Sequence, residues 1–371
     1  MSSIPKKNLV DALTIYKSVL GVNEKVAIDV RSNRCFIDMN DSAMAIRISF
    51  DVDQQAASTN QLTMEADRLL SFVKGGKSDL LNWSTKKTHS LMIDKMRLSV
   101  PIKEYETRSW TTLGEPTDPT EVTSAHLFAQ IAKTITPFSR GGYHNILESV
   151  CIRRKGKQLE LLSTDGFRIG IVHITGDGLD ELNDIDVIVP NKVLDVLVKL
   201  TKSDEPCKLF MSDKLFRLEV EHDGLFIEIA AAPIISAYPD VSPLLSKQPD
   251  HEWKVAATDL VQYCNLHKTV ETNKRMATAE FVLFDDKIAM ETKGNSEANS
   301  IIEGVKRLKG SGNYSIKMAL RFMVDAIDLV ALNGSEEIKI GVSTQSKMMW
   351  LRADSTNTSL KTMAIIVPIS E

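Results

Sequence analysis

The chain has 371 residues, of which 43% are hydrophobic and 25% are charged, and its formal net charge is −4. A chain of this length exceeds one ordinary hydrophobic core, so we expect two or three domains. The acidic balance argues against a nucleic-acid-binding protein, because such proteins are mostly basic overall, but a net charge says nothing about where the charges lie.

The sequence has no segment typical of a membrane or secreted protein. No apolar run approaches the roughly 20 residues that span a bilayer, and no apolar stretch follows Lys6 and Lys7. The four cysteines are far apart and form no C-x-x-C pair, which favours buried reduced thiols over zinc or disulfide bonds. We therefore expect a cytoplasmic protein without a metal or cofactor.

The predicted elements occur in the same order three times along the chain. Helical periodicity covers residues 8–20 and 65–73, then 124–136 and 191–200, then 259–268 and 318–332. Alternating strand patterns lie between these helices, and the first of them turns at Ser32-Asn33. Thr258 is expected to cap the fifth helix, and Asn333-Gly334 to end the sixth.

The repeat is about 120 to 130 residues long, which is the length of a domain. Polar, Pro-bearing segments at 114–119 and 246–250 mark the boundaries, so we expect domains over 1–120, 121–248 and 249–371. Strand pairs joined by short turns indicate antiparallel sheets with helices on one face. The predicted fold class is therefore α+β.

The motifs that could suggest catalysis lack the residues or the context that catalysis requires. Gly75-Gly76-Lys77-Ser78 resembles the end of a phosphate-binding loop, but Ser71 stands where the first glycine is required and a helix precedes it. Asp165 and Asp240 lie in turn sequences, where a turn-forming role is the commoner one. The histidines have no metal-binding spacing. We expect no enzymatic activity.

Four segments, in register with the repeat, resemble the β subunit of bacterial DNA polymerase III, the sliding clamp family. They are STDGFRI at 163–169, DVIVP at 186–190, AYPD at 237–240 and AIIVPI at 364–369. The resemblance covers essentially the whole chain and implies the DNA clamp fold. In that fold three repeated domains, each with two helices against antiparallel sheets, form a ring.

The resemblance also implies partners. It implies a head-to-tail homodimer that encircles double-stranded DNA without reading its sequence and tethers the polymerase. The DNA polymerase III α subunit and clamp-loader subunits would bind through short peptide motifs, and no membrane is involved. Two alternatives stay open from the residues alone: an enzyme on an unrelated α+β repeat fold, and a triplicated interaction scaffold that does not bind DNA.

By position, the family's peptide pocket falls at the boundary of the second and third domains. Its residues here are Leu147, Thr164, Gly166, Phe167, Arg168, Ile169, Pro239, Leu244, Ile365, Val367, Pro368 and Ile369. Phe167 stands where the family usually has His, Pro243 stands where Arg is common, and Ser370-Glu371 replaces the usual tail, so we expect a less cationic pocket. Without the resemblance, the alternation of Ile365, Val367 and Ile369 equally fits an ordinary core strand.

Two further surfaces are expected from the clamp resemblance. Basic residues that would face DNA are Lys17, Arg68, Lys74, Lys133, Lys192, Lys199, Lys202, Lys274 and Arg275. Residues of the expected dimer interface are Lys95, Arg97, Leu98, Val100, Thr269, Val270, Glu297 and Glu303. Lysines on the polar face of a helix are usually only solvated, and ordinary edge charges explain the proposed ion pairs equally well.

Overall fold

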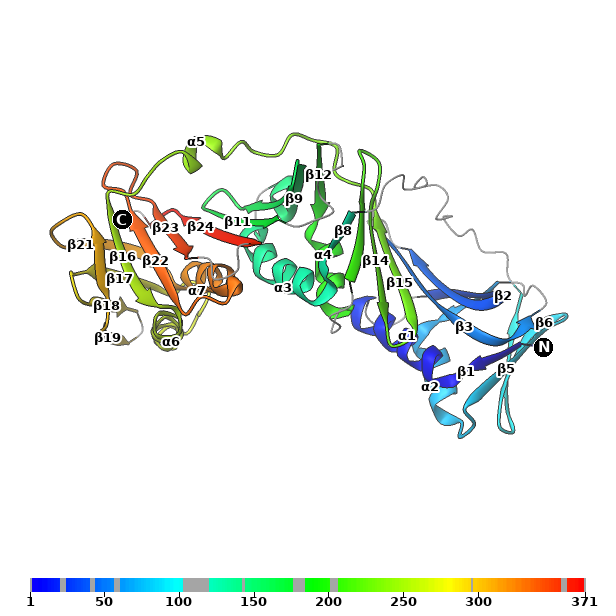
Figure 1. Ribbon diagram of the computed structural model, residues 1–371. Helices are drawn as coiled ribbons and strands as arrows, with labels where there is room; N and C mark the ends of the chain where they lie inside the picture. The colour runs from blue at the N-terminus through cyan, green and yellow to red at the C-terminus, as the bar shows by residue number, and fades with distance from the viewer. Residues whose placement is uncertain are drawn as a thin grey trace. The chain divides into compact units, whose positions relative to one another are not determined.

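The structure, a computed structural model, describes residues 2–20, 25–40, 44–56, 61–102, 120–141, 144–175, 184–200, 206–294, 296–354 and 359–369 (Figure 1). Helices and strands alternate along these residues, and the strand pairs that form the sheets are antiparallel. The expected α+β class is confirmed.

All six expected helices are present, with one short additional helix, α5. They are α1 (Lys6–Leu20), α2 (Ala66–Gly75), α3 (Ala125–Ile135), α4 (Asn191–Leu200), α5 (Ser242–Leu245), α6 (Ala257–Lys268) and α7 (Leu320–Val330). A 3-10 turn continues α7 to Gly334, whose φ of 81° ends the helix as predicted. The cap prediction for α6 was wrong: the helix begins at Ala257 after Ala256, so Thr258 lies inside it.

Residues 1–129 and 192–233 form one compact unit with two sheets. The four-stranded sheet has the order β1-β5-β6-β7, and the seven-stranded sheet has the order β4-β2-β3-β15-β14-β13-β8. Their strands are β1 (Ser2–Pro5), β2 (Lys25–Asn40), β3 (Met44–Ala56), β4 (Leu62–Glu65), β5 (Leu80–Thr85), β6 (Thr88–Ile93), β7 (Met96–Pro101), β8 (Thr120–Ser124), β13 (Pro206–Met211), β14 (Phe216–His222) and β15 (Leu225–Ala231).

The first strand of the seven-stranded sheet differs from its prediction. The two strands expected around Ser32-Asn33 are a single element, β2, whose register shifts between Ser32 and Arg34. The φ of Ser32 is 53°, in the left-handed region. Residues before this point pair with β4 and residues from it onward pair with β3, so the predicted turn marks a change of partner.

Residues 130–191 and 234–371 form the second compact unit, also with two sheets. The nine-stranded sheet has the order β12-β9-β10-β11-β24-β23-β22-β16-β20, and the four-stranded sheet has the order β19-β18-β17-β21. Their strands are β9 (Ser149–Lys155), β10 (Gln158–Thr164), β11 (Arg168–Thr175), β12 (Ile185–Pro190), β16 (His251–Ala256), β17 (Thr278–Leu283), β18 (Ile288–Lys293), β19 (Glu297–Ile302), β20 (Lys306–Lys309), β21 (Tyr314–Ala319), β22 (Glu337–Val342), β23 (Met349–Ala353) and β24 (Leu360–Ile366).

Both large sheets continue across the predicted domain boundaries. β15 pairs with β3 in the first unit, and β11 pairs with β24 in the second. The strands of the predicted central domain are therefore divided between two sheets, one shared with the preceding segment and one with the following segment. Division into the three domains 1–120, 121–248 and 249–371 stays a prediction.

The cores contain large apolar side chains and the free thiols. Trp83, Trp253 and Trp350 are fully buried. The four cysteines are unpaired and buried, and burial raises the pKa of the Cys151 thiol to about 11 and that of Cys264 to about 12. Buried thiols with raised pKa values are unreactive, because the thiolate is the nucleophile and the metal ligand. The prediction of reduced, buried cysteines is confirmed.

A buried histidine ties α6 to the edge of the smaller sheet in the second unit. The His267 ring is fully buried, with Nδ1 2.8 Å from Thr292 Oγ1 on β18 and Nε2 2.7 Å from Ser300 Oγ on β19. Burial lowers the pKa of His267, because the charged imidazolium is poorly solvated there.

We expect His267 to make the protein less stable in mild acid. The unfolded histidine has a pKa of about 6.5 and the folded one a lower value, so its contribution is complete above about pH 6.5 and is lost as the pH falls below it. Urea unfolding of the native protein and of His267→Gln across this range measures the effect. The free energy of unfolding should fall more steeply with acidification in the native protein, and equal slopes would contradict the assignment.

Candidate functional site

Cross-strand pairing builds an apolar floor from distant parts of the sequence. Thr164 pairs with Ile169, Ile169 with Ile365, and Ile365 with Trp350, across β10, β11, β24 and β23. Residues that pair directly across antiparallel strands have their side chains on the same face of the sheet. The four side chains therefore form one row on a single face of the nine-stranded sheet.

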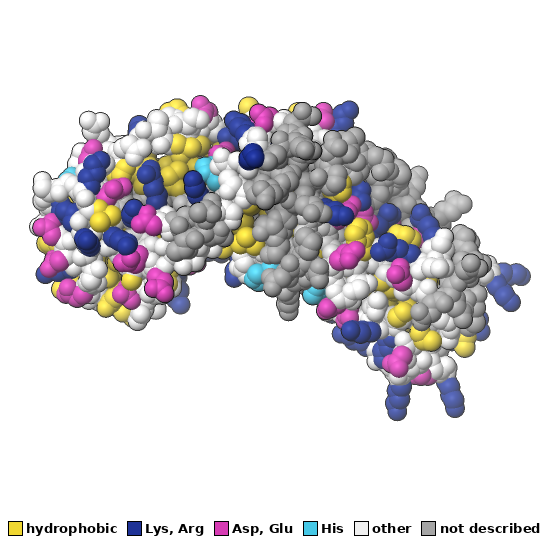
Figure 2. All heavy atoms as spheres, in the orientation of Figure 1, with side chains coloured by type: hydrophobic (Ala, Val, Ile, Leu, Met, Phe, Trp, Pro, Cys, Tyr) yellow, Lys and Arg dark blue, Asp and Glu magenta, His cyan; other side chains and the backbone are white. Residues whose placement is uncertain are grey.

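Ile169, Ile365 and Trp350 of this row belong to a hydrophobic cluster that is only partly covered. Its buried members are Cys151, Leu162, Ile169, Ile171, Ile188, Tyr238, Val241, Trp350 and Ile365, and the partly buried side chains packed on it are Ile146, Ile234, Leu244, Leu245, Met348 and Met363. Figure 2 shows hydrophobic side chains gathered on this part of the surface, near α5. The arrangement suits the binding of apolar side chains.

The turn between β10 and β11 forms one wall of the site and is held by its own side chains. Asp165 Oδ1 accepts hydrogen bonds from the backbone N–H groups of Phe167 and Arg168, at 2.9 and 3.1 Å. Gly166 has a φ of 91°, a conformation that favours glycine. The turn exposes 55% of Phe167 to solvent. Asp165 is therefore a turn-forming residue, as the sequence predicted.

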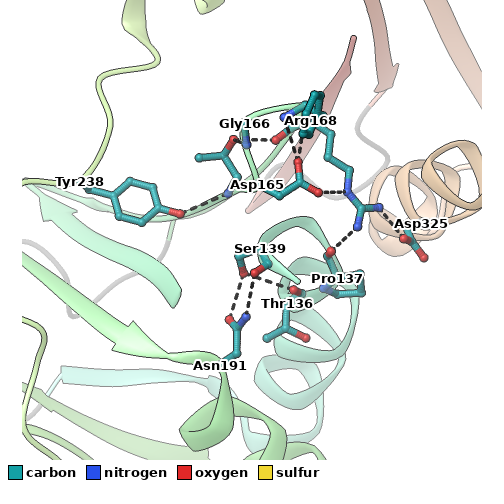
Figure 3. A network of polar contacts seen from close by, with 11 residues as sticks. Thr136, Pro137, Ser139, Asp165, Gly166, Arg168, Asn191, Tyr238 and Asp325 are labelled. Atoms are coloured by element: carbon teal, nitrogen blue, oxygen red, sulfur yellow. Dashed lines mark hydrogen bonds and ion pairs between the residues drawn. The ribbon is translucent and has the colours of Figure 1, made fainter. Parts of the chain in front are cut away.

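The Arg168 side chain is enclosed, and only 3% of it is exposed. Figure 3 shows its guanidinium donating to Asp165, to Asp325 on α7 and to the carbonyl of Pro137. The Nε to Asp165 Oδ2 distance is 2.9 Å and the Nη1 to Asp325 Oδ2 distance is 2.5 Å. The guanidinium also lies 4.1 Å from the ring centre of Phe322. Arg168 thus fastens the turn to α7 and to the segment after α3.

Tyr238 attaches the connector before α5 to the same turn. Its hydroxyl accepts a hydrogen bond from the Thr164 N–H at 3.2 Å and donates one to the Ser149 carbonyl at 3.1 Å. Burial raises the pKa of Tyr238, so the hydroxyl keeps its proton and remains a donor. Asp240 Oδ1 then accepts from the Ser242 N–H at 3.0 Å, which starts α5. Asp240 is a turn residue, as predicted.

The C-terminal tail after β24 forms backbone hydrogen bonds first with the turn between β10 and β11 and then with strand β21. Val367 N–H donates to the Phe167 carbonyl at 2.8 Å, and Ile369 N–H donates to the Lys317 carbonyl on β21 at 3.0 Å. The side chains of Val367 and Ile369 are 37% and 36% exposed. The tail therefore places two partly exposed apolar side chains, Val367 beside Phe167 and Ile369 beside β21.

Comparisons with known proteins agree with this geometry. Residues 121–236 match the family model for the central domain of the DNA polymerase III beta subunit. Over that segment the chain is similar to the beta-subunit family. The comparison with curated protein sequences finds no match.

Solved clamp structures match the chain over its full length. The DNA polymerase III subunit beta of Pseudomonas aeruginosa has a TM-score of 0.84 at 15% identity, covering 100% of both chains. The beta subunit from Streptococcus pyogenes has a TM-score of 0.85 at 17% identity, covering 100% of this chain and 99% of that one. The Helicobacter pylori beta clamp in complex with diflunisal has a TM-score of 0.84 at 16% identity, covering 100% of both chains. The chain has the beta-clamp fold.

The clamp fold brings the expected pocket residues together in the second unit, with different exposures. Thr164, Arg168, Ile169 and Ile365 are buried; Leu147, Leu244 and Pro368 are half-buried; Gly166, Phe167, Pro239, Val367 and Ile369 are exposed. The pocket prediction omitted Tyr238 and Trp350. Tyr238 was visible within AYPD, whereas Trp350 enters the site only through the β23–β24 register.

The residues expected to face DNA lie mostly on helix surfaces. Lys17 forms an ion pair with Asp67 on α2 at 2.8 Å. Lys202 lies outside the described residues. The exposed remainder are Arg68, Lys74, Lys133, Lys192, Lys199, Lys274 and Arg275. Their role in DNA binding stays a prediction.

The residues expected at the dimer interface lie on or near two edge strands. β7 ends one four-stranded sheet and carries Arg97, Leu98 and Val100, while β19 ends the other and begins at Glu297. Lys95, Thr269 and Glu303 are exposed and Val270 is half-buried. Other large apolar side chains are exposed as well: Met96 on β7, Leu266 on α6, Ile301 on β19, Ile102 and Met276.

Neither a membrane-spanning helix nor a metal-binding cluster is found in the described residues. In the described ranges, no helix combines the length and apolar character needed to cross a membrane. The same residues contain no cluster of His, Cys, Asp or Glu side chains arranged to bind a metal ion.

We expect Arg168→Lys to destabilise the protein by about 2–4 kcal/mol. A lysine would leave at least one of the three acceptors of the guanidinium, on Asp165, Asp325 and Pro137, without a hydrogen bond. Arg275→Lys, an exchange at an exposed position, is the matched control and should change stability by less than about 0.5 kcal/mol. Urea unfolding measures both values. An Arg168→Lys protein as stable as the control would contradict the role of the buried network.

Proposed function

We propose that this protein is a DNA sliding clamp: a homodimeric ring that encircles duplex DNA and tethers the replicative polymerase. The observation that carries the proposal is the clamp fold over the full chain, with β7 and β19 each ending a four-stranded sheet and each paired, among the described residues, with one strand only. An open edge strand needs a partner or protection. A head-to-tail dimer pairs β7 of each copy with β19 of the other and leaves neither edge open.

The side chains near the two edges are compatible with that pairing. Met96 and Leu98 provide apolar surface on β7, and Leu266 and Val270 provide it at the end of α6. Lys95 and Arg97 are basic, whereas Glu297 and Glu303 at the other edge are acidic. Opposite charges on the two edges favour a head-to-tail contact over contacts between like edges.

The DNA contacts of the ring are proposed to be weak and independent of sequence. Exposed lysines such as Lys192 and Lys199 on α4 offer contacts to phosphates, which carry no base information. Encirclement then supplies the retention that such contacts lack. A polymerase held on the ring experiences DNA at an effective concentration on the order of millimolar. The acidic net charge is compatible with this role, since retention does not depend on high affinity.

The apolar site of the second unit is proposed to bind peptides of partner proteins, among them the DNA polymerase III α subunit and clamp-loader subunits. Two or three Leu or Phe anchors contribute about 1.5–3 kcal/mol each on burial. After the cost of ordering the peptide, this corresponds to roughly micromolar affinity, which permits exchange of partners. The protein acts in the cytoplasm, with no cofactor and no catalysis of its own.

Retention on DNA tests encirclement directly. The protein is loaded onto nicked circular duplex DNA with a bacterial clamp loader and then washed with high salt. We expect it to remain on the circle and to leave when the circle is cut, because a ring slides off an end. Equal loss from intact and cut circles would refute encirclement and favour a scaffold that does not bind DNA.

Partner binding is tested at the half-buried Leu244 of α5. The probe is a labelled Gln-Leu-Ser-Leu-Phe peptide, of the Q-L-x-L-F type that the clamp resemblance implies. We expect Leu244→Asp to weaken its binding at least about tenfold, because the change places a charge on the apolar cluster. Ser242→Asp introduces the same charge at an exposed position of α5 and should have little effect. Fluorescence anisotropy measures the affinities, and unchanged affinity in Leu244→Asp argues against the site.

A further inference from the structure

A second groove, of about 970 Å³, lies beside the tail in the same unit. Strand β21, the outward side chains of β17 and β18, the turn between β22 and β23, and residues Val367, Pro368 and Ile369 line it. Val367 belongs to this lining and also to the predicted peptide pocket. The groove therefore begins where the apolar site ends.

In the described residues, the edge of β21 that faces this groove bonds only the tail. Leu320 N–H donates to the Ala277 carbonyl at 2.9 Å, so Met318 and Ile316, at alternate positions of β21, bond β17. The intervening residues Ser315 and Lys317 direct their N–H and C=O groups away from β17. Ile369 N–H of the tail already occupies the Lys317 carbonyl, so the backbone groups left for another extended chain are those of Ser315 and the Lys317 N–H.

The groove also carries lysines that lack a carboxylate partner. Glu291 pairs with Lys293 at 3.0 Å, and Glu280 accepts a hydrogen bond from the Ser315 hydroxyl at 2.5 Å. Among the described residues, no carboxylate lies within ion-pair distance of Lys317 or of Lys347, which also lines the groove.

The position of Lys347 is unusual for its residue type. It lies in the turn between β22 and β23, and its φ is 53°. This left-handed conformation is unfavourable for a residue with a side chain and would suit glycine better. The turn thus holds a cation at the groove in a conformation that turn formation alone does not favour.

We propose that this groove binds an extended acidic segment that flanks the anchor residues of a partner peptide. The segment adds a strand to the outer edge of β21 and places carboxylates beside Lys317 and Lys347. This mode combines backbone hydrogen bonds for affinity with side-chain charges for selectivity. The proposal rests on the proposed function, because the anchors must occupy the pocket for the flank to pass over Val367.

Peptides that differ only in their flank test the proposal. Labelled Gln-Leu-Ser-Leu-Phe is prepared alone and with four flanking residues, either Asp and Glu or the neutral Asn and Gln, on its N-terminal or its C-terminal side. We expect the acidic flank on one side to bind about three- to tenfold more tightly than its neutral counterpart, and the advantage to shrink in high salt. Methylating the backbone nitrogens of that flank should lower its affinity as well.

Protein variants assign the effect to the groove. The double variant Lys317→Glu with Lys347→Glu should abolish the advantage of the acidic flank and leave binding of the unflanked peptide unchanged. Lys306→Glu, at an exposed position of β20 outside the groove, is the matched control. Circular dichroism and the melting temperature should be unchanged, because all three lysines are exposed.

Two results overturn the inference while leaving the pocket intact: equal affinities for the acidic and neutral flanks on both sides, or an advantage that survives in the double variant. If the groove instead binds a second copy of the chain, the acidic and neutral flanks bind with equal affinity and the double variant self-associates less strongly. Failure of the unflanked peptide to bind refutes the pocket itself, and the flank proposal with it.

Discussion

The pairing of β11 with β24 is the constraint on which the candidate site depends. It joins residues 168–174 to residues 360–366, which are far apart in the chain, into one nine-stranded sheet. Through it Ile169 and Ile365 become neighbours, and the β23–β24 register adds Trp350 to the same row. A shift of the pairing by one residue would turn these side chains to the opposite face and remove the apolar floor. The site therefore exists only where this register holds.

A buried charge reinforces the same junction on the other face of the sheet. A Cβ atom on Gly170, next to Ile169 in β11, would lie 2.9 Å from Phe138 and 3.1 Å from Leu329, so α7 and the segment after α3 pack closely there. Arg168 links β11 to both segments by donating hydrogen bonds to Asp325 on α7 and to the Pro137 carbonyl after α3. A buried guanidinium is costly without partners and specific with them, so the network favours one arrangement of the turn over others. The turn that forms the wall of the pocket is thus held by three hydrogen bonds of its most polar side chain.

The sequence predicted the parts of the molecule that local patterns encode. Six helices followed from apolar periodicity, and the turn roles of Asp165 and Asp240 followed from their short-range sequence context. The cap of α6 was wrong because Ala256, with no side-chain cap, begins the helix at the end of β16. There the sheet decides where the helix starts, and the capping preference of Thr258 has no influence.

The sequence alone did not predict the features that depend on pairing between distant strands. Trp350 carries no local signal for a binding site, and its place in the floor comes from a strand register that a single sequence does not specify. The same holds for the central segment, whose strands divide between two sheets although its sequence reads as one unit. Helices and turns are settled by residues within a few positions of each other, whereas sheets are settled by partners that only the folded chain brings together.

The departures of this chain from the clamp pattern have a physical consequence for partner choice. By the resemblance to the clamp family, Phe167 stands where a histidine is usual and Pro243 where an arginine is common, so we expect the apolar site itself to offer little charge to a ligand. Its selectivity must come from the shape of the pocket and from groups at its margin. Lys317 and Lys347 lie at that margin, beyond the tail, where water screens them and each contributes modestly. Apolar anchor residues in the pocket would then hold a partner, and its flanking segment would distinguish it from other partners. In a cationic pocket, both binding and selectivity would arise in the pocket itself.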